Sequence, residues 1–304
     1  MAPFFLAILY KVSTFSFEII GWTAFFCIQV SWSSSPNWSR LLLLSKILNR
    51  HKTLHNHQNV FISQNEINEF QNFIQQRLSG RPVSRIINTR SFWKKEFQIN
   101  ESTLDPRSDS ETLIETIIKH YADKLQLIKI LDLGSGSGCL GLSLLDEFPC
   151  SKVTFFDKSK QSLEIAKKNS QNLGLLERSK YINSDWKVKD WDTKLITFEN
   201  NIKFDIVISN PPYIPTNEIK TLKKEVKEHD PYVALNGGID GLEAYRYILP
   251  KLINIIKPKG KIFLEIGKGQ KNLVTAMAKD HGLLVEDYVK DLSGVIRVII
   301  LITK

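Results

Sequence analysis

Residues 131–139 read LDLGSGSGC, and this stretch decides the fold of the 304-residue chain. It begins with an apolar run and continues into three glycines, Gly134, Gly136 and Gly138, which allow the backbone to turn tightly and to pass close to a ligand. Glycine-rich turns of this kind join a strand to a helix where nucleotide-like ligands bind at the carboxyl edge of a parallel sheet. We therefore predict that residues 131–139 connect the first strand of such a sheet to the helix that follows.

The sequence on both sides of this stretch predicts the rest of the sheet. Strand-like apolar runs alternate with amphipathic helical runs such as ETLIETIIKHY and LEAYRYILPKLINII, which indicates a mainly parallel sheet with helices on both faces. Two closing runs have no helix between them and predict an antiparallel hairpin at one edge. The predicted fold class is α/β, with a Rossmann-like sheet. The expected strands lie in KILDLG, VTFFD, KYINSD, FDIVISN, KIFLEIG, LVEDYV and VIRVIILIT.

Upstream of the sheet we predict three further segments: an apolar extension over residues 1–30, a small helical domain over residues 31–80 and a β-hairpin linker over residues 81–106. Within the helical segment, Ser63 and Glu66 form a capping-box pattern ahead of apolar residues at helical spacing. Residues 107–304 then form the main domain.

The extension over residues 1–30 contains two apolar runs, but neither reaches the length of about 18 residues that is typical of a membrane span. No charged side chain precedes the first run, whereas a secretory signal requires positive charge before its apolar core. We interpret this segment as a buried helix or a misassigned start. A membrane anchor or secretory signal and an organelle-targeting segment are the alternatives.

Composition narrows the class of protein further. The formal net charge of +9 would suit a partner that is, or lies on, nucleic acid, although a lysine-rich base-composition bias has the same effect. The three cysteines, Cys27, Cys139 and Cys150, form no CxxC pair, so neither a disulfide framework nor a cysteine zinc site is indicated. Three histidines between residues 51 and 57 lack acidic or cysteine partners at a fixed spacing, which favours a polar loop, and we predict no metal site.

The glycine-rich turn predicts the chemistry of its ligand. Its spacing is GxGxG, whereas dinucleotide-binding enzymes have GxGxxG. Asp132 lies beside the turn, where an acid would oppose a phosphate but could pair with a cationic cofactor. S-adenosylmethionine is such a cofactor, because it carries a sulfonium and an ammonium group and no phosphate. A dinucleotide, or a tight turn whose acids only cap helices, is the alternative.

Acidic and aromatic residues at the ends of the next two strands support this prediction. Asp157 can accept hydrogen bonds from both ribose hydroxyls, Asp185 can hold the adenine amino group, and Trp186 can stack on the adenine ring. The predicted cofactor-binding residues are Gly134, Ser135, Gly136, Ser137, Gly138, Asp157, Asp185, Trp186 and Asn210.

The tetrapeptide Asn210-Pro211-Pro212-Tyr213 follows the fourth strand and predicts the reaction. The lone pair of an amide or exocyclic amino nitrogen is delocalised, so such a nitrogen is a poor nucleophile. The side-chain oxygen of Asn210 and the carbonyl of Pro211 could accept its N–H bonds as a methyl group arrives. The prolines restrict the backbone, and Tyr213 can lie against a flat substrate group. A proline-terminated strand without function is the alternative.

At these residues the chain resembles the HemK-type protein-(glutamine-N5) methyltransferases, over about residues 35–304. The segments RPVSRIINTRSFW, LDPRSDSETLIE, DPYVALNGGIDGLEAYRYI and DLSGVIRVI are also similar to that family. Three residues depart from its usual pattern: Asn88 replaces a glycine, Ser108 a proline and Asp109 a glutamate. Residues 1–30 match no part of the family.

The resemblance implies a class I methyltransferase domain with a small helical N-terminal domain for substrate recognition. It also implies methyl transfer from S-adenosylmethionine to the glutamine of the GGQ motif in class I peptide-chain release factors. Asn210, Pro211 and Tyr213 would then be catalytic, and residues 210–213, including Pro212, would bind the glutamine. An adenine-N6 methyltransferase acting on DNA or RNA is the alternative, since adenine presents the same kind of nitrogen. We further expect a monomer in a bacterial cytoplasm, or else in a mitochondrial matrix, with no nucleic-acid or membrane partner.

Overall fold

The computed structural model describes residues 8–12, 15–22, 25–32, 43, 45–47 and 59–304. The chain divides into two compact units, residues 1–87 and residues 88–304. No helix among the described residues has both the length and the apolar character that crossing a membrane requires.

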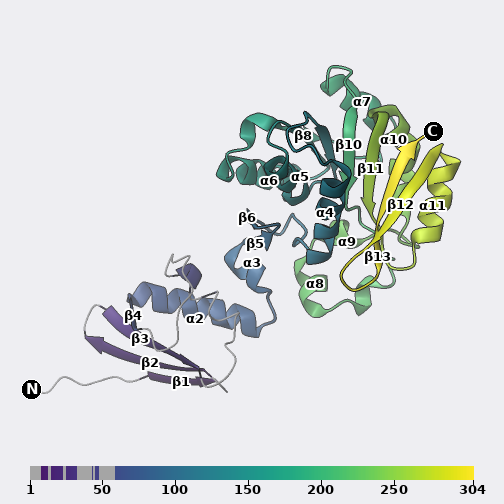
Figure 1. Ribbon diagram of the computed structural model, residues 1–304. Helices are drawn as coiled ribbons and strands as arrows, with labels where there is room; N and C mark the ends of the chain where they lie inside the picture. Colours follow the sequence, from purple (N-terminus) through teal and green to yellow (C-terminus); the bar gives the residue numbers. More distant parts are fainter. Residues whose placement is uncertain (1–7, 13–14, 23–24, 33–42, 44, 48–58) are drawn as a thin grey trace, which may run out of the picture. The chain divides into compact units, whose positions relative to one another are not determined.

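The larger unit is built on a seven-stranded sheet with the order β12-β13-β11-β10-β7-β8-β9 (Figure 1). The strands from β7 to β11 pair in parallel, whereas β13 is antiparallel to both β11 and β12. The predicted class of fold and its antiparallel closing hairpin are therefore confirmed. The strand bounds are β7 Lys129–Leu133, β8 Lys152–Asp157, β9 Ser179–Asn183, β10 Phe204–Ser209, β11 Ile256–Glu265, β12 Leu283–Lys290 and β13 Ile296–Thr303.

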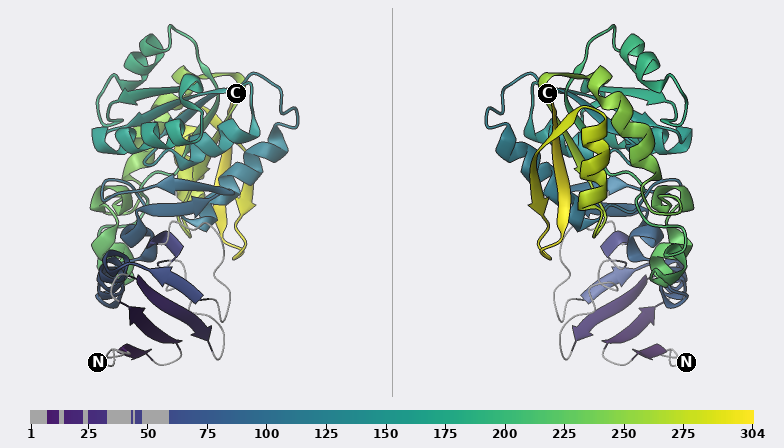
Figure 2. Two further views of the ribbon diagram at one scale, coloured as in Figure 1. Left: turned by 90° about the vertical axis from the view of Figure 1, so that its left-hand side faces the viewer. Right: turned by 90° about the vertical axis from the view of Figure 1, so that its right-hand side faces the viewer.

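Helices cover both faces of this sheet, and each face has its own hydrophobic core. One core packs residues of α4 (Glu111–His120), α5 (Cys139–Glu147) and α6 (Lys160–Asn172) against the strands. The other packs α7 (Trp191–Phe198), α10 (Glu243–Ile255) and α11 (Lys271–Asp280) against the opposite face. Figure 2 shows the closing strands β12 and β13 at the sheet edge beside α11. Central strands buried on both faces explain why their sequences are almost continuously apolar.

The strand order reverses between β7 and β10, because the chain moves outward from β7 through β8 and β9 and then returns to β10 on the other side. Open α/β sheets bind ligands in the crevice outside the carboxyl ends of the strands at such a point. Both segments singled out in the sequence, residues 131–139 and 210–213, follow these two strands.

A hairpin of β5 (Thr89–Phe92) and β6 (Lys95–Gln98) opens the larger unit. It is anchored to α6, where the Asn169 amide accepts from the backbone of Gln98 and donates back to it, at 2.7 and 3.0 Å. Asn88 precedes the hairpin with φ 53°, a left-handed conformation that asparagine tolerates better than most residues other than glycine. This explains how asparagine replaces the glycine that is usual in the resembled family.

The smaller unit differs from the sequence expectation. Residues 1–30 were interpreted as a buried helix or a misassigned start. The described residues there belong instead to the strands β1 (Ile8–Val12), β2 (Phe15–Trp22) and β3 (Phe25–Trp32). Together with β4 (Asn59–Ile62) they make an antiparallel sheet in the order β1-β2-β3-β4. The helix interpretation was wrong because aromatic and β-branched residues, which favour strands, dominate these runs.

Helices also occur in the smaller unit. Residues 43 and 45–47 are helical, and α2 (Gln64–Leu78) begins with the predicted capping box of Ser63 and Glu66. The expectation that residues 31–80 are helical is therefore only partly right, because β4 lies within them. Residues 83–87 form the short helix α3 (Val83–Ile87), although they fall inside the expected hairpin linker. The histidines at 51, 55 and 57 lie outside the described residues.

Candidate active site

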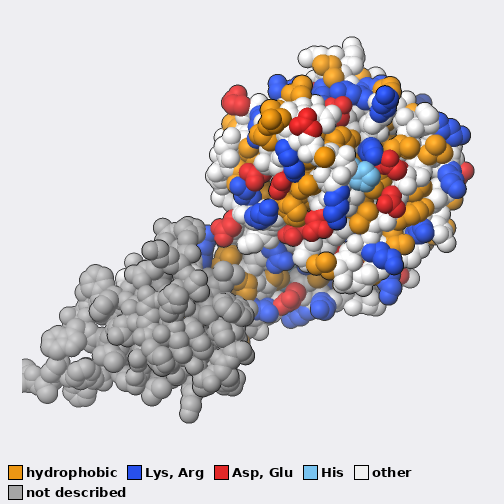
Figure 3. All heavy atoms as spheres, viewed as in Figure 1, with side chains coloured by type: hydrophobic (Ala, Val, Ile, Leu, Met, Phe, Trp, Pro, Cys, Tyr) orange, Lys and Arg blue, Asp and Glu red, His pale blue; other side chains and the backbone are white. Residues whose placement is uncertain are grey.

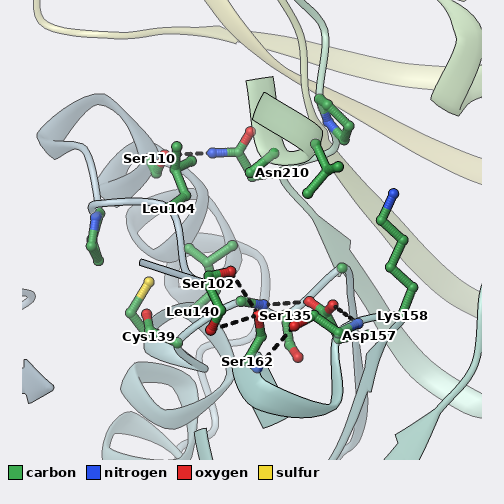
Figure 4. A pocket seen from close by; sticks show the side chains of 18 of the residues that line it. Ser102, Leu104, Ser110, Ser135, Cys139, Leu140, Asp157, Lys158, Ser162 and Asn210 are labelled. Atoms are coloured by element: carbon green, nitrogen blue, oxygen red, sulfur yellow. Dashed lines mark hydrogen bonds between the residues drawn. The ribbon is translucent and has the colours of Figure 1, made fainter. Parts of the chain in front are cut away.

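A cavity lies at the carboxyl edge of the sheet, beneath the turn that follows β7 (Figure 4). Side chains after β7, β8, β9 and β10 line it together with residues 102–110, which lead into α4. At one end of the view Asn210 lies beside Ser110, and at the other end Asp157 lies beside Ser135. The predicted residues Gly134, Ser135, Gly136, Ser137, Asp157, Asp185, Trp186 and Asn210 all line this cavity.

The glycine turn is held open toward the cavity by backbone hydrogen bonds. The amides of Gly134 and Ser135 both donate to the carbonyl of Phe156, at 2.7 and 3.1 Å. All three glycines have positive φ values, from 54° to 78°. A Cβ added to Gly136 would meet no heavy atom within 4 Å, so the turn presents bare backbone to the cavity there. This shape suits a cofactor that lies against the loop.

Gly138, which is also predicted to bind the cofactor, is not among the residues that line the cavity, and its surroundings show a packing role. An added Cβ would lie 3.0 Å from the Cβ of Ala166 on α6. Its amide donates to the carbonyl of Ser135 at 2.8 Å, and it caps the N-terminus of α5. Gly138 thus allows close packing between α5 and α6.

Asp157, at the end of β8, ties the glycine turn to the next helix. One carboxylate oxygen accepts from the amide of Gly136 and the other from the amide of Ser159, both at 2.8 Å. Burial raises the pKa of Asp157, and the two amide hydrogen bonds oppose this rise. Each carboxylate oxygen has a second lone pair, so Asp157 can accept further hydrogen bonds from a diol in the cavity.

Asp132 does not face the cavity, contrary to the prediction that it could pair with a cationic cofactor. It is fully buried, and one carboxylate oxygen accepts from the amide of Gly141 in α5 at 2.9 Å. Its other oxygen has no hydrogen-bond partner within the described part of the chain. Burial raises the pKa of Asp132 to about 7. Asp132 therefore positions α5 beneath the glycine turn.

The loop Asn210-Pro211-Pro212-Tyr213 separates this cavity from a second one. Asn210 and Pro212 line both cavities, whereas Pro211 and Tyr213 line only the second. The second cavity is also lined by Val226, Ala234 and Leu235, which are apolar. The tetrapeptide thus lies where a group in one cavity could react with a group in the other.

Two residues that the sequence analysis missed hold this loop. The Asn210 amide nitrogen donates to the Ser110 hydroxyl at 2.9 Å, and that hydroxyl donates to Glu265 at 2.6 Å. The other carboxylate oxygen of Glu265 accepts from the Tyr213 hydroxyl at 3.0 Å. Burial raises the pKa of Glu265 to about 7 and also raises the pKa of Tyr213.

Arg107 is a third missed residue, and it lines both cavities. Its guanidinium pairs with the carboxylate of Asp230, which also accepts from the backbone of Asp105 at 3.2 Å. Ser110 and Arg107 lie in LDPRSDSETLIE, a segment noted only for its family resemblance. In the sequence, Glu265 could have been noticed as an acid that directly follows the apolar residues Ile262, Phe263 and Leu264 at the carboxyl end of a strand.

Comparison with known proteins agrees with this geometry. The family model for the methyltransferase small domain matches residues 102–229. The chain is 37% identical over 239 residues to a release factor glutamine methyltransferase of Caulobacter vibrioides, covering 79% of each protein. It is also 37% identical over 228 residues to a release factor glutamine methyltransferase of Bradyrhizobium diazoefficiens, covering 74% of this chain and 73% of that protein.

A longer relative matches over only part of its length. The chain is 35% identical over 263 residues to a bifunctional methyltransferase of Rickettsia felis, covering 77% of this chain and 48% of that protein. The two other relatives are each covered over about three quarters of their length or more. On this similarity, the chain belongs to the release factor glutamine methyltransferase family.

Proposed function

We propose that this protein transfers a methyl group from S-adenosylmethionine to the side-chain amide nitrogen, N5, of the glutamine in the GGQ motif of class I release factors. The observation that carries the proposal is the position of Asn210 and Pro212, which line two adjoining cavities. One cavity has the glycine turn and the acidic strand ends expected for the cofactor. The other has the walls expected for a flat amide.

In this proposal the cavity beneath the glycine turn holds the cofactor. Asp157 would accept from the ribose hydroxyls, the backbone at Gly136 would allow close approach, and Trp186 and Asp185 would contact the adenine. Trp186 is already packed near the turn, since a Cβ added to Gly134 would lie 2.9 Å from its ring. When bound, S-adenosylmethionine supplies an electrophilic methyl group on a sulfonium.

Asn210 and Pro211 would act on the substrate amide. Its two N–H bonds donate to the Asn210 side-chain oxygen and the Pro211 carbonyl, which orients the nitrogen and stabilises positive charge as it develops there. Tyr213 packs beside the amide plane from the second cavity. No strong general base is required, because the amide N–H becomes acidic only once the nitrogen has been methylated, and water can then take the proton.

Surface charge helps to choose between a protein and a nucleic-acid substrate. On the face drawn in Figure 3, Lys and Arg side chains are interspersed with Asp and Glu and do not form one basic field. Duplex binding proteins normally neutralise several phosphates with clustered basic residues. The face drawn therefore lacks the usual pattern for duplex binding, which is in keeping with glutamine as the substrate, even though the net charge is +9.

The deciding experiment incubates the protein with S-adenosylmethionine and a class I release factor, followed by mass spectrometry of the GGQ peptide. We expect one added methyl group on the glutamine, and none when that glutamine is replaced by alanine. DNA and RNA are assayed in parallel for methyladenine. Methyladenine together with an unmodified release factor would replace the glutamine proposal with the adenine alternative.

We also propose that residues 31–80 contribute to recognition of the release factor, since they lie in the unit that does not contain the cavities. The monomeric state and the compartment stay predictions. Gel filtration with light scattering tests the first, and localisation of a tagged protein in its own cell tests the second.

A further inference from the structure

Ser110 lies between two groups that constrain the direction of its hydrogen bonds. It belongs to the short 3-10 helix Ser108–Ser110 that leads into α4, and it is almost fully buried. Its hydroxyl donates to Glu265, at the carboxyl end of β11, while the Asn210 amide donates to it from the end of β10. Three segments distant in sequence thus meet in one hydrogen-bonded chain.

The charge on Glu265 determines which group donates and which accepts in each of these hydrogen bonds. An ionised carboxylate can only accept hydrogen bonds, and a serine hydroxyl has a single proton to donate. That proton goes to Glu265, so Ser110 can face Asn210 only as an acceptor. The group that Asn210 turns toward Ser110 must therefore be its NH₂. The side-chain oxygen of Asn210, which has no hydrogen-bond partner among the described residues, is left available to accept from a substrate.

We propose that Glu265 is a positioning residue that, through Ser110, selects the amide orientation in which Asn210 presents its oxygen to the substrate N–H. The same carboxylate holds Tyr213 through its other oxygen, so one buried acid orders both ends of the tetrapeptide loop. This inference rests on the proposed function, because it assigns Asn210 the role of accepting from a substrate amide.

Protonation of Glu265 would reverse the direction of these hydrogen bonds. A protonated carboxyl can donate to Ser110, whose own proton is then free to point at Asn210 and favour the opposite amide orientation. Burial raises the pKa of Glu265 to about 7. The charged groups nearby are Arg297 on β13, which lowers this pKa and pairs with Asp291, and Asp109, which raises it. The Tyr213 hydroxyl donates to the Glu265 carboxylate, and the Tyr245 hydroxyl donates to the Glu265 backbone carbonyl.

The ionised form of Glu265 is the one that orients Asn210 correctly. Methylation should therefore fall as the pH drops through the pKa of Glu265, up to about tenfold per pH unit below it. Glu265→Gln should flatten this acid limb and lower kcat about tenfold at pH 8, because the glutamine amide must donate to one of its two neighbours. Affinity for S-adenosylhomocysteine, measured by calorimetry, should not change.

Substitutions at Ser110 separate positioning from packing. Ser110→Thr keeps the hydroxyl and should keep kcat within about twofold, whereas Ser110→Ala should lower it about tenfold. The double variant Ser110→Ala/Asn210→Ala should be no slower than Asn210→Ala alone, because Ser110 acts only through Asn210. Glu286→Gln on β12, whose carboxylate pairs with Lys261, is the matched control and should behave as wild type.

A measurement without substrate keeps this inference distinct from the proposed function. The Asn210 side-chain amide signal in a ¹⁵N NMR spectrum should shift with pH in the wild type and stay constant in Glu265→Gln. If the wild type fails to methylate release factor while this signal titrates, the proposed function fails. The relay of hydrogen bonds from Glu265 through Ser110 to Asn210 then still stands. A signal that does not titrate, or effects of Ser110→Ala and Asn210→Ala that multiply, would overturn the relay.

Discussion

The Asn210 amide has two tasks, since its nitrogen holds Ser110 while its oxygen is proposed to accept from the substrate. Asn210→Ala removes the second interaction at the point where charge develops, so kcat should fall about 100-fold or more. Binding of S-adenosylmethionine should weaken far less, because the glycine turn and Asp157 remain. Stopped-flow or steady-state kinetics combined with calorimetry measure both quantities.

The matched control for Asn210 is Asn254→Ala on α10, where the amide donates to Asp192 and lines neither cavity. This variant should keep wild-type kcat. An Asn210→Ala enzyme with unchanged kcat would remove the residue from the reaction.

Asp157 carries a second prediction for a single residue. Its carboxylate accepts from Gly136 and Ser159, so Asp157→Ala loses the proposed contact to the ribose and also loosens the glycine turn. A hydrogen bond to a charged group contributes roughly 1.5 to 3 kcal/mol, so affinity for S-adenosylmethionine should fall at least tenfold by calorimetry. Asp157→Asn keeps one acceptor oxygen, so its affinity for S-adenosylmethionine should fall less than that of Asp157→Ala. Equal affinities of wild type and Asp157→Ala would contradict the assignment.

Among the elements, the strands of the larger sheet were predictable because each combines an apolar run with a polar or glycine-rich end. The sheet of residues 8–32 and 59–62 was not. Its last pairing joins Phe26 to Ile62 across a separation of 36 positions, and such distant pairing leaves no periodic signal in a local window. Short apolar runs are also ambiguous between a buried helix and a strand, and length alone misled the interpretation.

The order in which the strands of this sheet pair gives a prediction about a shortened protein. A variant lacking residues 1–30 loses β1, β2 and most of β3, so β4 is left with an unpaired edge that favours aggregation. Its affinity for S-adenosylmethionine should nevertheless match the full chain, because every residue that lines the two cavities lies between 102 and 235. Light scattering on the two proteins tests the expected aggregation, and calorimetry tests the affinity for S-adenosylmethionine. Loss of cofactor binding in a soluble variant would show that the first unit supports the site.

At the scale of the whole molecule, the site combines residues that local patterns could find with residues that they could not. The glycine turn and the tetrapeptide are short motifs with their own chemistry. Ser110 and Glu265 are separated by 155 positions, and only the folded sheet brings them together beneath Asn210. Neither residue is conspicuous in its own segment. Ser110 resembles an ordinary residue at the start of a helix, and Glu265 resembles the polar residue that commonly ends a strand.

Stability is a property of the whole molecule, and two buried acids give it a pH dependence. Burial raises the pKa of both Asp132 and Glu265 to about 7, whereas the unfolded chain loses these protons near pH 4. Between pH 4 and 7 the folded state therefore binds more protons than the unfolded state, and these groups lower the free energy of unfolding as pH rises. Each can contribute a slope of up to about 1.4 kcal/mol per pH unit.

Urea titrations between pH 4.5 and 7.5 measure that slope, and Asp132→Asn should reduce it. Asp240→Asn is the control, since the ion pair with Arg246 lowers the pKa of Asp240 to about 2 and places its effect below this window.

Over the same range the proposed relay makes methylation rise with pH, because ionised Glu265 is the form that orients Asn210. Stability and activity should therefore change in opposite directions between pH 5 and 7, and Glu265→Gln should weaken both dependences at once. An unfolding free energy that rises with pH across the window, with Glu265→Gln leaving it unaltered, would contradict burial of an ionisable acid beneath this site.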